Sequence, residues 1–288
     1  MGRSVGNGPL VWKHRTGEFR LDRTHVMGVV NVTPDSFSDG GRHFEPAAAI
    51  RRTLQMANEG ADLLDVGGES TRPRSDPVPA HEEWRRVGPV LEAVTRKLDV
   101  PISIDTRKPE IAEKALQVGA SIVNDVTGLR DPRMVGIIAQ AGAGAVIMHI
   151  RGDPKTMQDD PRYEDVVRQV RDFLEERVRS ASANGVARES VAVDPGIGFG
   201  KSVAHNLTLL RGLGTIAAIG VPIVVGVSRK SFIGALGGGE AGERLPGSLA
   251  AATLAVAHGA HVVRAHDVAE TVRAMRVADA VLRGHENL

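Results

Sequence analysis

Polar side chains follow one short apolar segment after another along this chain, and their types suit a charged, polar ligand. In chain order they are Asn31, Asp65, Asp105, Asn124 with Asp125, His149, Asp194, Ser228-Arg229-Lys230, and Arg264 with His266. A single Asp or Asn in such a place often only caps the next helix or satisfies a turn. Capping does not explain why arginine, lysine and histidine recur among them, so the set predicts one ligand site.

Two glycine patterns imitate nucleotide-binding motifs, but both fail on spacing. Gly196, Gly198 and Gly200 are spaced G-x-G-x-G, whereas a dinucleotide fingerprint needs G-x-G-x-x-G. Gly200-Lys201-Ser202 looks like the end of a phosphate-binding loop, but the first glycine of that motif would fall at Pro195. These glycines therefore predict a tight loop beside the ligand.

The apolar segments are short enough to be strands buried on both faces of a sheet, and helical segments separate them. The predicted strands are 25–30, 61–66, 100–104, 121–124, 145–149, 191–193, 222–227 and 261–264. Pro46 and Pro109 open helical segments that Gly60 and Gly119 close. Eight such units in 288 residues predict an α/β fold, a (β/α)8 TIM barrel whose carboxyl strand ends open onto the active site.

Two further elements are predicted around this barrel. The segment 163–184 places Val166, Val170, Phe173, Leu174 and Val178 on one face, which is typical of a helix that covers a sheet. The segment 10–21 alternates around Thr16-Gly17, so a short N-terminal β-hairpin is expected before the first strand. We expect one domain over 1–288, with 1–24 as its N-terminal extension.

Composition excludes several classes of function. The 36 basic and 35 acidic residues nearly cancel, so nothing favours nucleic acid or an anionic membrane as a partner. The chain has no cysteine, which removes disulfides, thiolate metal sites and thiol nucleophiles. The first twenty residues do not read as a signal peptide, and no apolar run is long enough to span a bilayer. We expect a cytoplasmic protein.

Longer blocks of sequence surround the polar residues, one at each strand end. They are NVTPDSFSDGG at 31–41, DVGGESTRP at 65–73, SIDT at 103–106, NDV at 124–126, MH at 148–149, DPGIGF at 194–199, SRKS at 228–231 and RAHD at 264–267. In this order they resemble the dihydropteroate synthase family, from about 26 to 268. The chain departs from the family pattern at Arg74, where glycine is usual, and at Ala265, where valine is common.

The resemblance implies a transferase reaction in folate biosynthesis. The amine of para-aminobenzoate displaces pyrophosphate from 6-hydroxymethyl-7,8-dihydropterin pyrophosphate, which forms a C–N bond and gives 7,8-dihydropteroate. The pterin edge has a guanidine-like pair of donors that one carboxylate can meet with two hydrogen bonds, and Asp194 is the candidate. Asn124 and Lys230 are expected on the pterin edge, and Met148 and Gly226 beside the ring.

An SN1-like displacement puts positive charge on the pterin methylene and negative charge on the leaving pyrophosphate, which fixed charges can stabilise. Asp105 is expected to face the cation. Lys230, Arg264 and His266 are expected to form a cationic cluster, with Arg264 and His266 on the pyrophosphate. Mg²⁺ bridging the phosphate oxygens needs only one or two protein ligands, and the resemblance assigns Asn31.

The resemblance also implies two loops that close over the site, after the first and second strands. Asp35 and Arg72 on these loops are expected to join the metal and the pyrophosphate in the closed state. Thr71, Pro73, Phe199 and Ser231 are expected to form the para-aminobenzoate pocket, with Ser231 and a helix N-terminus at its carboxylate. Closure would exclude water from the pterin cation.

Two alternatives remain open at this point, and the family adds one partner. A corrinoid-dependent methyltransferase barrel would share the Asp and Asn positions but has no pyrophosphate to hold, so the SRKS block argues against it. A pterin-binding paralogue without catalysis would keep the fold and lose the reaction. The family further implies a homodimer, whose interface the sequence does not reveal.

Overall fold

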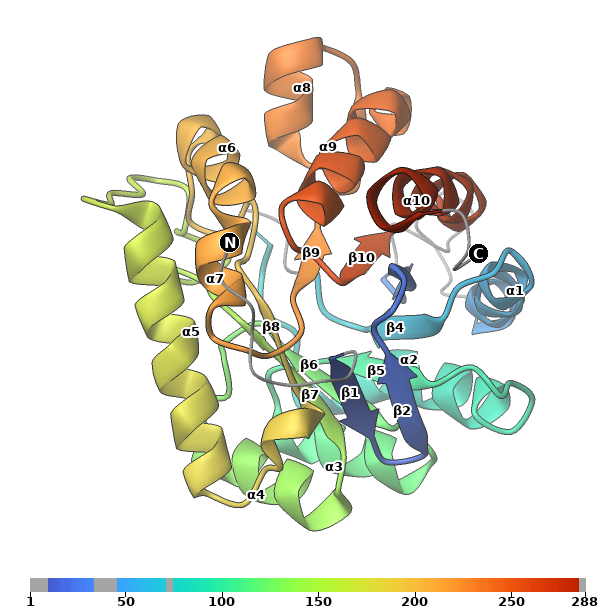
Figure 1. Ribbon diagram of the computed structural model, residues 1–288. Coiled ribbons are helices and arrows are strands. Elements are labelled where there is room, and N and C mark those ends of the chain that lie inside the picture. The colour runs from blue at the N-terminus through green and yellow to red at the C-terminus, as the bar shows by residue number, and fades with distance from the viewer. Residues whose placement is uncertain (1–9, 34–45, 71–74, 285–288) are drawn as a thin grey trace.

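The computed structural model describes residues 10–33, 46–70 and 75–284, and an eight-stranded parallel sheet lies at its centre (Figure 1). Its strands are β3 (His25–Asn31), β4 (Leu63–Gly67), β5 (Ile102–Asp105), β6 (Ile122–Asp125), β7 (Gly144–Met148), β8 (Val191–Asp194), β9 (Val224–Gly226) and β10 (Val262–Ala265). Their order is β8-β7-β6-β5-β4-β3-β10-β9. A parallel bridge between Val193 and Ile223 joins β8 to β9, so the sheet closes and the predicted (β/α)8 barrel is confirmed.

Helices surround this sheet on the outside (Figure 1). They are α1 (Pro46–Asn58), α2 (Ala80–Val94), α3 (Pro109–Gln117), α4 (Pro132–Ala141), α5 (Val166–Ala183), α6 (Val203–Arg211), α7 (Leu213–Ala217), α8 (Ser231–Gly237), α9 (Leu245–Ala257) and α10 (Val268–Arg283), with 3-10 turns at η1 (Arg188–Ser190) and η2 (Ala241–Glu243). Within the described ranges, no helix is both long and apolar enough to cross a membrane.

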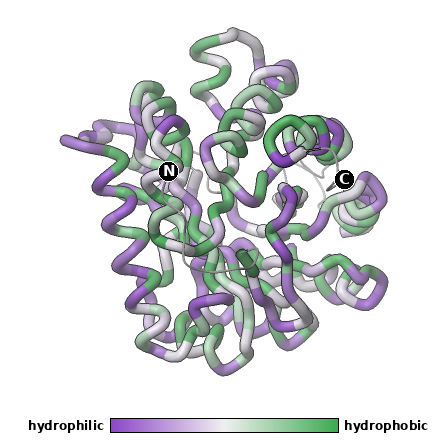
Figure 2. Tube along the Cα trace, in the orientation of Figure 1, coloured by the Kyte–Doolittle hydropathy of each residue, from purple (hydrophilic) through white to green (hydrophobic). Residues whose placement is uncertain are grey.

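Local sequence signals set where these helices begin and end. Pro46, Pro109 and Pro132 each occupy the first position of a helix, where the missing N–H costs no hydrogen bond. The long helix begins at Val166, three residues after the start expected from periodicity, because the Asp165 side chain caps it by accepting a hydrogen bond from the Arg168 N–H. Its predicted apolar face is buried against the barrel, with the charged face outward (Figure 2).

The N-terminal hairpin closes the amino end of the barrel. Strands β1 (Val11–His14) and β2 (Gly17–Arg20) pair antiparallel, as predicted. Trp12 is fully buried, packs beside Phe19, and donates its indole N–H to the Ser190 carbonyl oxygen at 3.1 Å. Both rings pack on a layer of side chains from the barrel interior, namely Met27, Leu63, Ile122, Val146, Ala192, Val224 and Val262. The hairpin is therefore the floor of the barrel core.

We expect Trp12→Ala to lower the free energy of unfolding by about 3–5 kcal/mol, because it empties a fully buried aromatic site beneath seven strands. Chemical denaturation followed by circular dichroism measures the loss. Lys13→Ala is the matched control on the same strand: its ion pair with Glu189 is half exposed on both sides, so a change below about 0.5 kcal/mol is expected. Equal effects of the two substitutions would contradict the role of the hairpin as a floor.

Candidate active site

The carboxyl ends of the barrel strands enclose a cavity with two compartments. The outer compartment has a volume of about 520 Å³ and is lined by Asn31, Thr33, Ser70, Ser228, Arg229, Ser231, Arg244 and His266, among others. The inner compartment, of about 20 Å³, is lined by Asp105, Asn124, Val126, Met148, Asp194 and Ile197. Phe199, Gly226, Lys230 and Arg264 line both compartments, so the two are continuous. Every described residue to which the family resemblance gave a role lies on this cavity, whereas the polar strand residues Asp65, Asp125 and His149 do not line it.

Arg264 holds two carboxylates together at the centre of the site. Its Nε donates to Asp65 Oδ2 at 2.6 Å, and its Nη2 donates to Asp105 Oδ2 at 2.7 Å. Burial alone would lower the pKa of Arg264, but the charges of Asp65 and Asp105 raise it above its ordinary value. Burial, opposed by Arg264 and reinforced by Asp65, raises the pKa of Asp105 to about 7. Asp105, which was predicted to face the pterin cation, and Arg264, which was predicted to bind pyrophosphate, are thus bonded to each other.

Asp65 is the charged residue whose role the sequence did not reveal. It lies within β4, fully buried, and its Oδ2 also accepts a hydrogen bond from Asn124 Nδ2 at 3.0 Å. Its Oδ1 has no hydrogen-bond partner among the residues that the structure describes. An aspartate inside an apolar strand was the available signal, because a buried carboxylate needs a cation close by.

Asp194 and Lys230, which carry opposite charges, both line the inner compartment. Asp194 Oδ1 accepts a hydrogen bond from the Gly196 N–H at 2.7 Å, and burial raises the pKa of Asp194 although Lys230 and Arg264 oppose this. The Lys230 ammonium lies 4.2 Å from the centre of the Phe199 ring. Burial, together with the charge of Arg264, lowers the pKa of Lys230 to about 8. Lys230 therefore keeps its proton at neutral pH.

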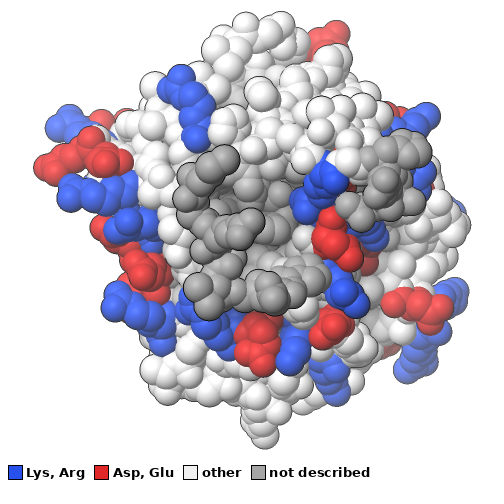
Figure 3. Space-filling view, viewed as in Figure 1, with Lys and Arg blue, Asp and Glu red and all other residues white. Residues whose placement is uncertain are grey.

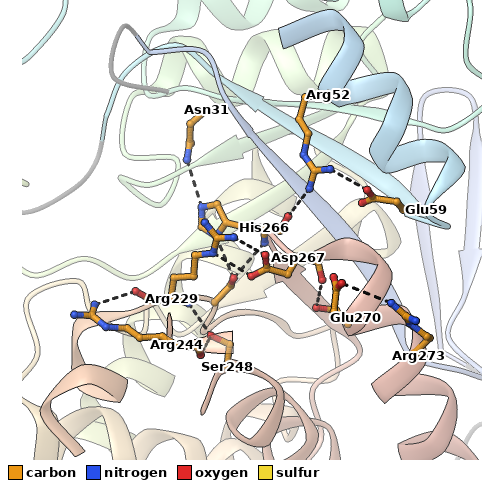
Figure 4. Close-up of polar contacts among 12 residues, drawn as sticks. Asn31, Arg52, Glu59, Arg229, Arg244, Ser248, His266, Asp267, Glu270 and Arg273 are labelled. Carbon is orange, nitrogen blue, oxygen red and sulfur yellow. Dashed lines mark hydrogen bonds and ion pairs between the residues drawn. The ribbon is translucent and has the colours of Figure 1, made fainter. Parts of the chain in front are cut away.

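His266 belongs to the outer compartment but is not a cation at neutral pH. Burial, together with Arg264 and Arg229, lowers its pKa to about 3, so the expectation of a cationic histidine is wrong on this point. Its Nδ1 lies 3.1 Å from Ser228 Oγ, and its Nε2 lies 3.5 Å from Asn31 Nδ2 (Figure 4). A neutral imidazole here can donate or accept a hydrogen bond. Arg52 holds the backbone of His266 in place by donating to its carbonyl oxygen at 2.9 Å.

Arg229 lines the outer compartment, but its guanidinium is paired with Asp267 and its backbone positions the neighbouring Lys230 and Ser231. Its backbone is left-handed, with φ of 58°, and its N–H donates to Ser248 Oγ at 2.9 Å. Its guanidinium turns to Asp267 at the start of α10 (Figure 4). Arg244 donates to the Arg229 carbonyl oxygen at 3.3 Å and also lines the outer compartment, a role that the sequence did not reveal.

Two polar strand ends lie outside the cavity. The Asp125 carboxylate accepts hydrogen bonds from the N–H groups of Thr127 and Leu129, so it stabilises a turn. His149 is buried against Lys201, whose ammonium lies 2.9 Å from His149 Nδ1. Asp125 thus has the ordinary structural role of an aspartate in a turn.

The base of the second loop is held by a cluster of buried charges. Glu69 accepts a hydrogen bond from Arg107 at 2.7 Å and pairs with Lys108, which also pairs with the fully buried Glu83. The predicted site residues Asp35, Thr71, Arg72 and Pro73, and Arg74, lie outside the described residues. In the described part of the chain, no three His, Asp or Glu side chains converge as a metal site.

The family model described as pterin binding enzyme matches residues 27–266, which is nearly the whole barrel. The dihydropteroate synthase of Escherichia coli strain K12 is 46% identical over 267 residues, 93% of this chain and 95% of that protein. That of Neisseria meningitidis serogroup B is 48% identical over 278 residues, 94% of this chain and 97% of that protein.

Solved structures agree with these sequence matches. Xanthomonas albilineans dihydropteroate synthase with 4-aminobenzoic acid is 47% identical, with a TM-score of 0.87 over 92% of this chain and 96% of that chain. The Yersinia pestis enzyme with a sulfonamide drug is 40% identical, with a TM-score of 0.89 over 94% of this chain and 98% of that chain. The chain therefore belongs to the pterin-binding enzymes and, within them, to the dihydropteroate synthase family.

We expect Arg264→Leu to lower the free energy of unfolding by about 3–5 kcal/mol near neutral pH, because it leaves two buried carboxylates without their cation. The loss should be smaller at pH 5 than at pH 8. In the folded protein Asp105 already binds its proton more tightly than its ordinary pKa of 3.8 allows, and without Arg264 that pKa rises further. Between pH 3.8 and the raised pKa of Asp105 in the folded variant, the folded state holds more protons than the unfolded state. The stability of the variant therefore falls as the pH rises through this range.

Urea denaturation of both proteins across pH 5–8 measures this difference. Arg133→Leu is the control, since it removes an ion pair at the surface with Asp131 and should leave the curve unchanged. A cost for Arg264→Leu that does not depend on pH would contradict the assigned carboxylate pair.

Proposed function

We propose that this protein condenses 6-hydroxymethyl-7,8-dihydropterin pyrophosphate with para-aminobenzoate and releases 7,8-dihydropteroate and pyrophosphate, as a step of folate biosynthesis. The observation that carries the proposal is the continuous cavity in which Asp194, Lys230, Arg264 and His266 meet. Relatives support it, because the Xanthomonas albilineans synthase has been solved with 7,8-dihydropteroate and matches this chain at 45% identity and a TM-score of 0.84.

The inner compartment is the proposed pterin subsite. Asp194 Oδ1 is engaged by the Gly196 N–H, which leaves Oδ2 and the outward face of the carboxylate for the amino and ring N–H donors of the pterin. Asn124 can meet the mixed edge of the ring, and Met148 and Gly226 line its faces. Because the inner compartment is continuous with the outer one, a bicyclic ring bound to Asp194 would extend toward Lys230, whose ammonium suits the pterin carbonyl.

Arg264, Asp105 and His266 are the proposed groups around the breaking C–O bond. As a carboxylate, Asp105 stabilises the positive charge that develops on the methylene. That positive charge in turn lowers the pKa of Asp105, which burial has raised. Arg264 donates from Nε and Nη2 to the two carboxylates, so Nη1 is the nitrogen that can donate to the departing pyrophosphate. His266 contributes a neutral imidazole hydrogen bond to the same oxygens.

A Mg²⁺ ion is part of the proposal, with Asn31 as its protein ligand. The Asn31 side chain stands at the outer compartment beside His266 and offers one amide oxygen. A site with so few protein oxygens fits an ion that is held mainly by water and by pyrophosphate oxygens. When bound, the ion would neutralise charge on the leaving group.

The para-aminobenzoate subsite is proposed in the outer compartment, between Phe199 and Ser231. Ser231 Oγ and the Lys230 ammonium suit the carboxylate, and the Phe199 ring suits the apolar face. Thr71, Pro73, Asp35 and Arg72 complete the closed site in the proposal.

A cytoplasmic location stays a prediction.

We expect purified protein with Mg²⁺ to release pyrophosphate only when both substrates are present, and to form dihydropteroate in equal amount. A coupled pyrophosphate assay with chromatography of the pterin product measures this. Asp194→Ala and Lys230→Ala should each weaken pterin binding at least tenfold in a direct titration, since each removes a charge-assisted contact in the inner compartment.

Both variants should keep the circular dichroism spectrum of the parent protein. Release of pyrophosphate from the pterin substrate alone, with no dependence on para-aminobenzoate, would contradict the condensation. Unchanged pterin titrations in both variants would contradict the pterin subsite.

We also propose that the protein forms a homodimer through the surface of α6, α8 and α9. A groove of about 480 Å³ there is lined mainly by apolar side chains, and Leu236 and Leu254 are 61% and 57% exposed. The helix α9 is apolar around its circumference, as LPGSLAAATLAVA shows, and such helices are normally buried on every side. Few charged residues lie over α8 and α9 in Figure 3, whereas α5 carries many.

Leu254→Glu should convert the dimer to a monomer, because it places a charge in the apolar groove. Light scattering after size-exclusion chromatography gives the mass. Arg171→Glu, on the exposed face of α5, is the control and should leave the mass unchanged. A monomeric parent protein at micromolar concentration would contradict the proposal.

A further inference from the structure

Lys201 is a buried cation to which the site described above gives no role. It follows the last glycine of the β8–α6 loop and is 2% exposed. Its ammonium lies 2.9 Å from His149 Nδ1, donates to the Phe199 carbonyl oxygen at 2.9 Å, and reaches the His149 carbonyl oxygen at 3.4 Å. No carboxylate is bonded to it among the described residues, although a buried ammonium normally needs one.

The loop around Lys201 is pressed closely against the end of β7. Gly196, Gly198 and Gly200 have φ of +68°, +82° and +64°, a conformation that side chains rarely tolerate. A Cβ atom on Gly196 would lie 1.9 Å from the His149 carbonyl oxygen and 3.4 Å from Lys201 Nζ. The Gly196 N–H donates to Asp194, so the ammonium and the carboxylate lie on either side of a single glycine.

Lys201 thus lies beside the glycine whose N–H bonds Asp194 but outside the cavity that Asp194 lines, on what we call its rear side. Asp194 lines the inner compartment and Lys201 lines neither compartment. The hydrogen bond from the Gly196 N–H, followed by the charges of Lys230, Arg264 and Lys201, lowers the pKa of Asp194 against the effect of burial. The carboxyl group of Asp105 lines the same compartment. Burial lowers the pKa of Lys201 to about 7, opposed by Asp194 and reinforced by Lys230.

His149, whose imidazole contacts the Lys201 ammonium, stays uncharged. Burial, with the charges of Lys201, Arg130 and Arg151, lowers its pKa to about 2. Its imidazole can therefore accept a hydrogen bond from the ammonium. In the acidic range where a buried carboxyl takes up a proton, Lys201 is the charged member of this pair.

We propose that Lys201 is a positioning residue for pterin recognition, which supplies the rear counter-charge that keeps Asp194 ionised and ties the loop carrying Phe199 to the end of β7. The proposal rests on the proposed function, since it assumes that Asp194 binds the pterin. It gives the lysine a purpose in the site without any contact to substrate.

The two parts of this role have different signatures. A pterin meets Asp194 with two parallel hydrogen bonds only when the carboxyl group is ionised. Loss of the rear charge raises the pKa of Asp194, so pterin binding fails at a higher pH than before. Loss of a loop contact alone weakens binding by the same factor at every pH.

The experiment titrates 6-hydroxymethyl-7,8-dihydropterin into the protein by calorimetry between pH 4.5 and 8.5. For Lys201→Met we expect the acidic midpoint of binding to move up by about one pH unit, so that affinity is about tenfold lower on the acidic side and changes little above neutrality. The same ligand is used throughout, so its own ionisation cancels in the comparison.

Tyr163→Phe is the matched control for the loop. Its hydroxyl donates to the Gly200 carbonyl oxygen at 3.0 Å, and burial raises the pKa of Tyr163 to about 12, so the substitution removes a loop contact and no charge. We expect weaker binding with an unchanged midpoint. Lys201→Arg keeps a cation and should keep the midpoint, and Lys201→Gln replaces Lys201→Met where the latter does not fold.

Each outcome decides between the ideas. A Lys201→Met titration weakened equally at all pH values, or a midpoint equal to that of the parent, overturns the counter-charge. Failure of the parent protein to bind the pterin at any pH overturns the proposed function instead, and is seen in the same measurement.

Discussion

The pairing of Arg264 with Asp65 and Asp105 is the interaction on which the site depends. Three charged groups from β10, β4 and β5 occupy the interior of the barrel at its carboxyl end, where each alone would be costly to bury. One guanidinium satisfies two carboxylates with separate nitrogens, and Asn124 gives a further donor to Asp65. With both carboxylates ionised, the trio carries a net negative charge, which suits the cation that we propose forms on the pterin methylene.

Supporting residues around this trio act on backbone as much as on charge. Ser248 of α9 and Arg244, the residue just before that helix, hold the left-handed backbone of Arg229, which sets the direction of the next two residues. The Ser228 hydroxyl oxygen accepts a hydrogen bond from the His266 backbone N–H and also contacts the His266 imidazole. The active site is thus built largely from the last two strand–helix units of the barrel, with acidic groups supplied by β4, β5 and β8.

Much of this arrangement could be predicted from the sequence, because a buried parallel strand is an apolar run and any polar residue that ends it is conspicuous. Asn31, Asp105, Asn124, Asp194, Lys230, Arg264 and His266 were all found in this way and lie on one cavity. The same signal could not separate Asp125, which stabilises a turn, because its partners are local N–H groups that any loop offers. Nor could it show that Arg264 pairs with a carboxylate 199 positions away, or that burial leaves His266 neutral. Those facts depend on which side chains the closed barrel brings together.

The hairpin floor ties the beginning of the chain to its end. Trp12 and Phe19 pack on Val224 and Val262, and Thr24 donates hydrogen bonds to Asp279 in the last helix. As the chain leaves the ribosome, its first aromatic side chains therefore have no complete surface to pack on until almost every strand has been synthesised. Contacts of such long sequence separation form late and slowly. The hairpin therefore completes its packing only after β10 has been synthesised.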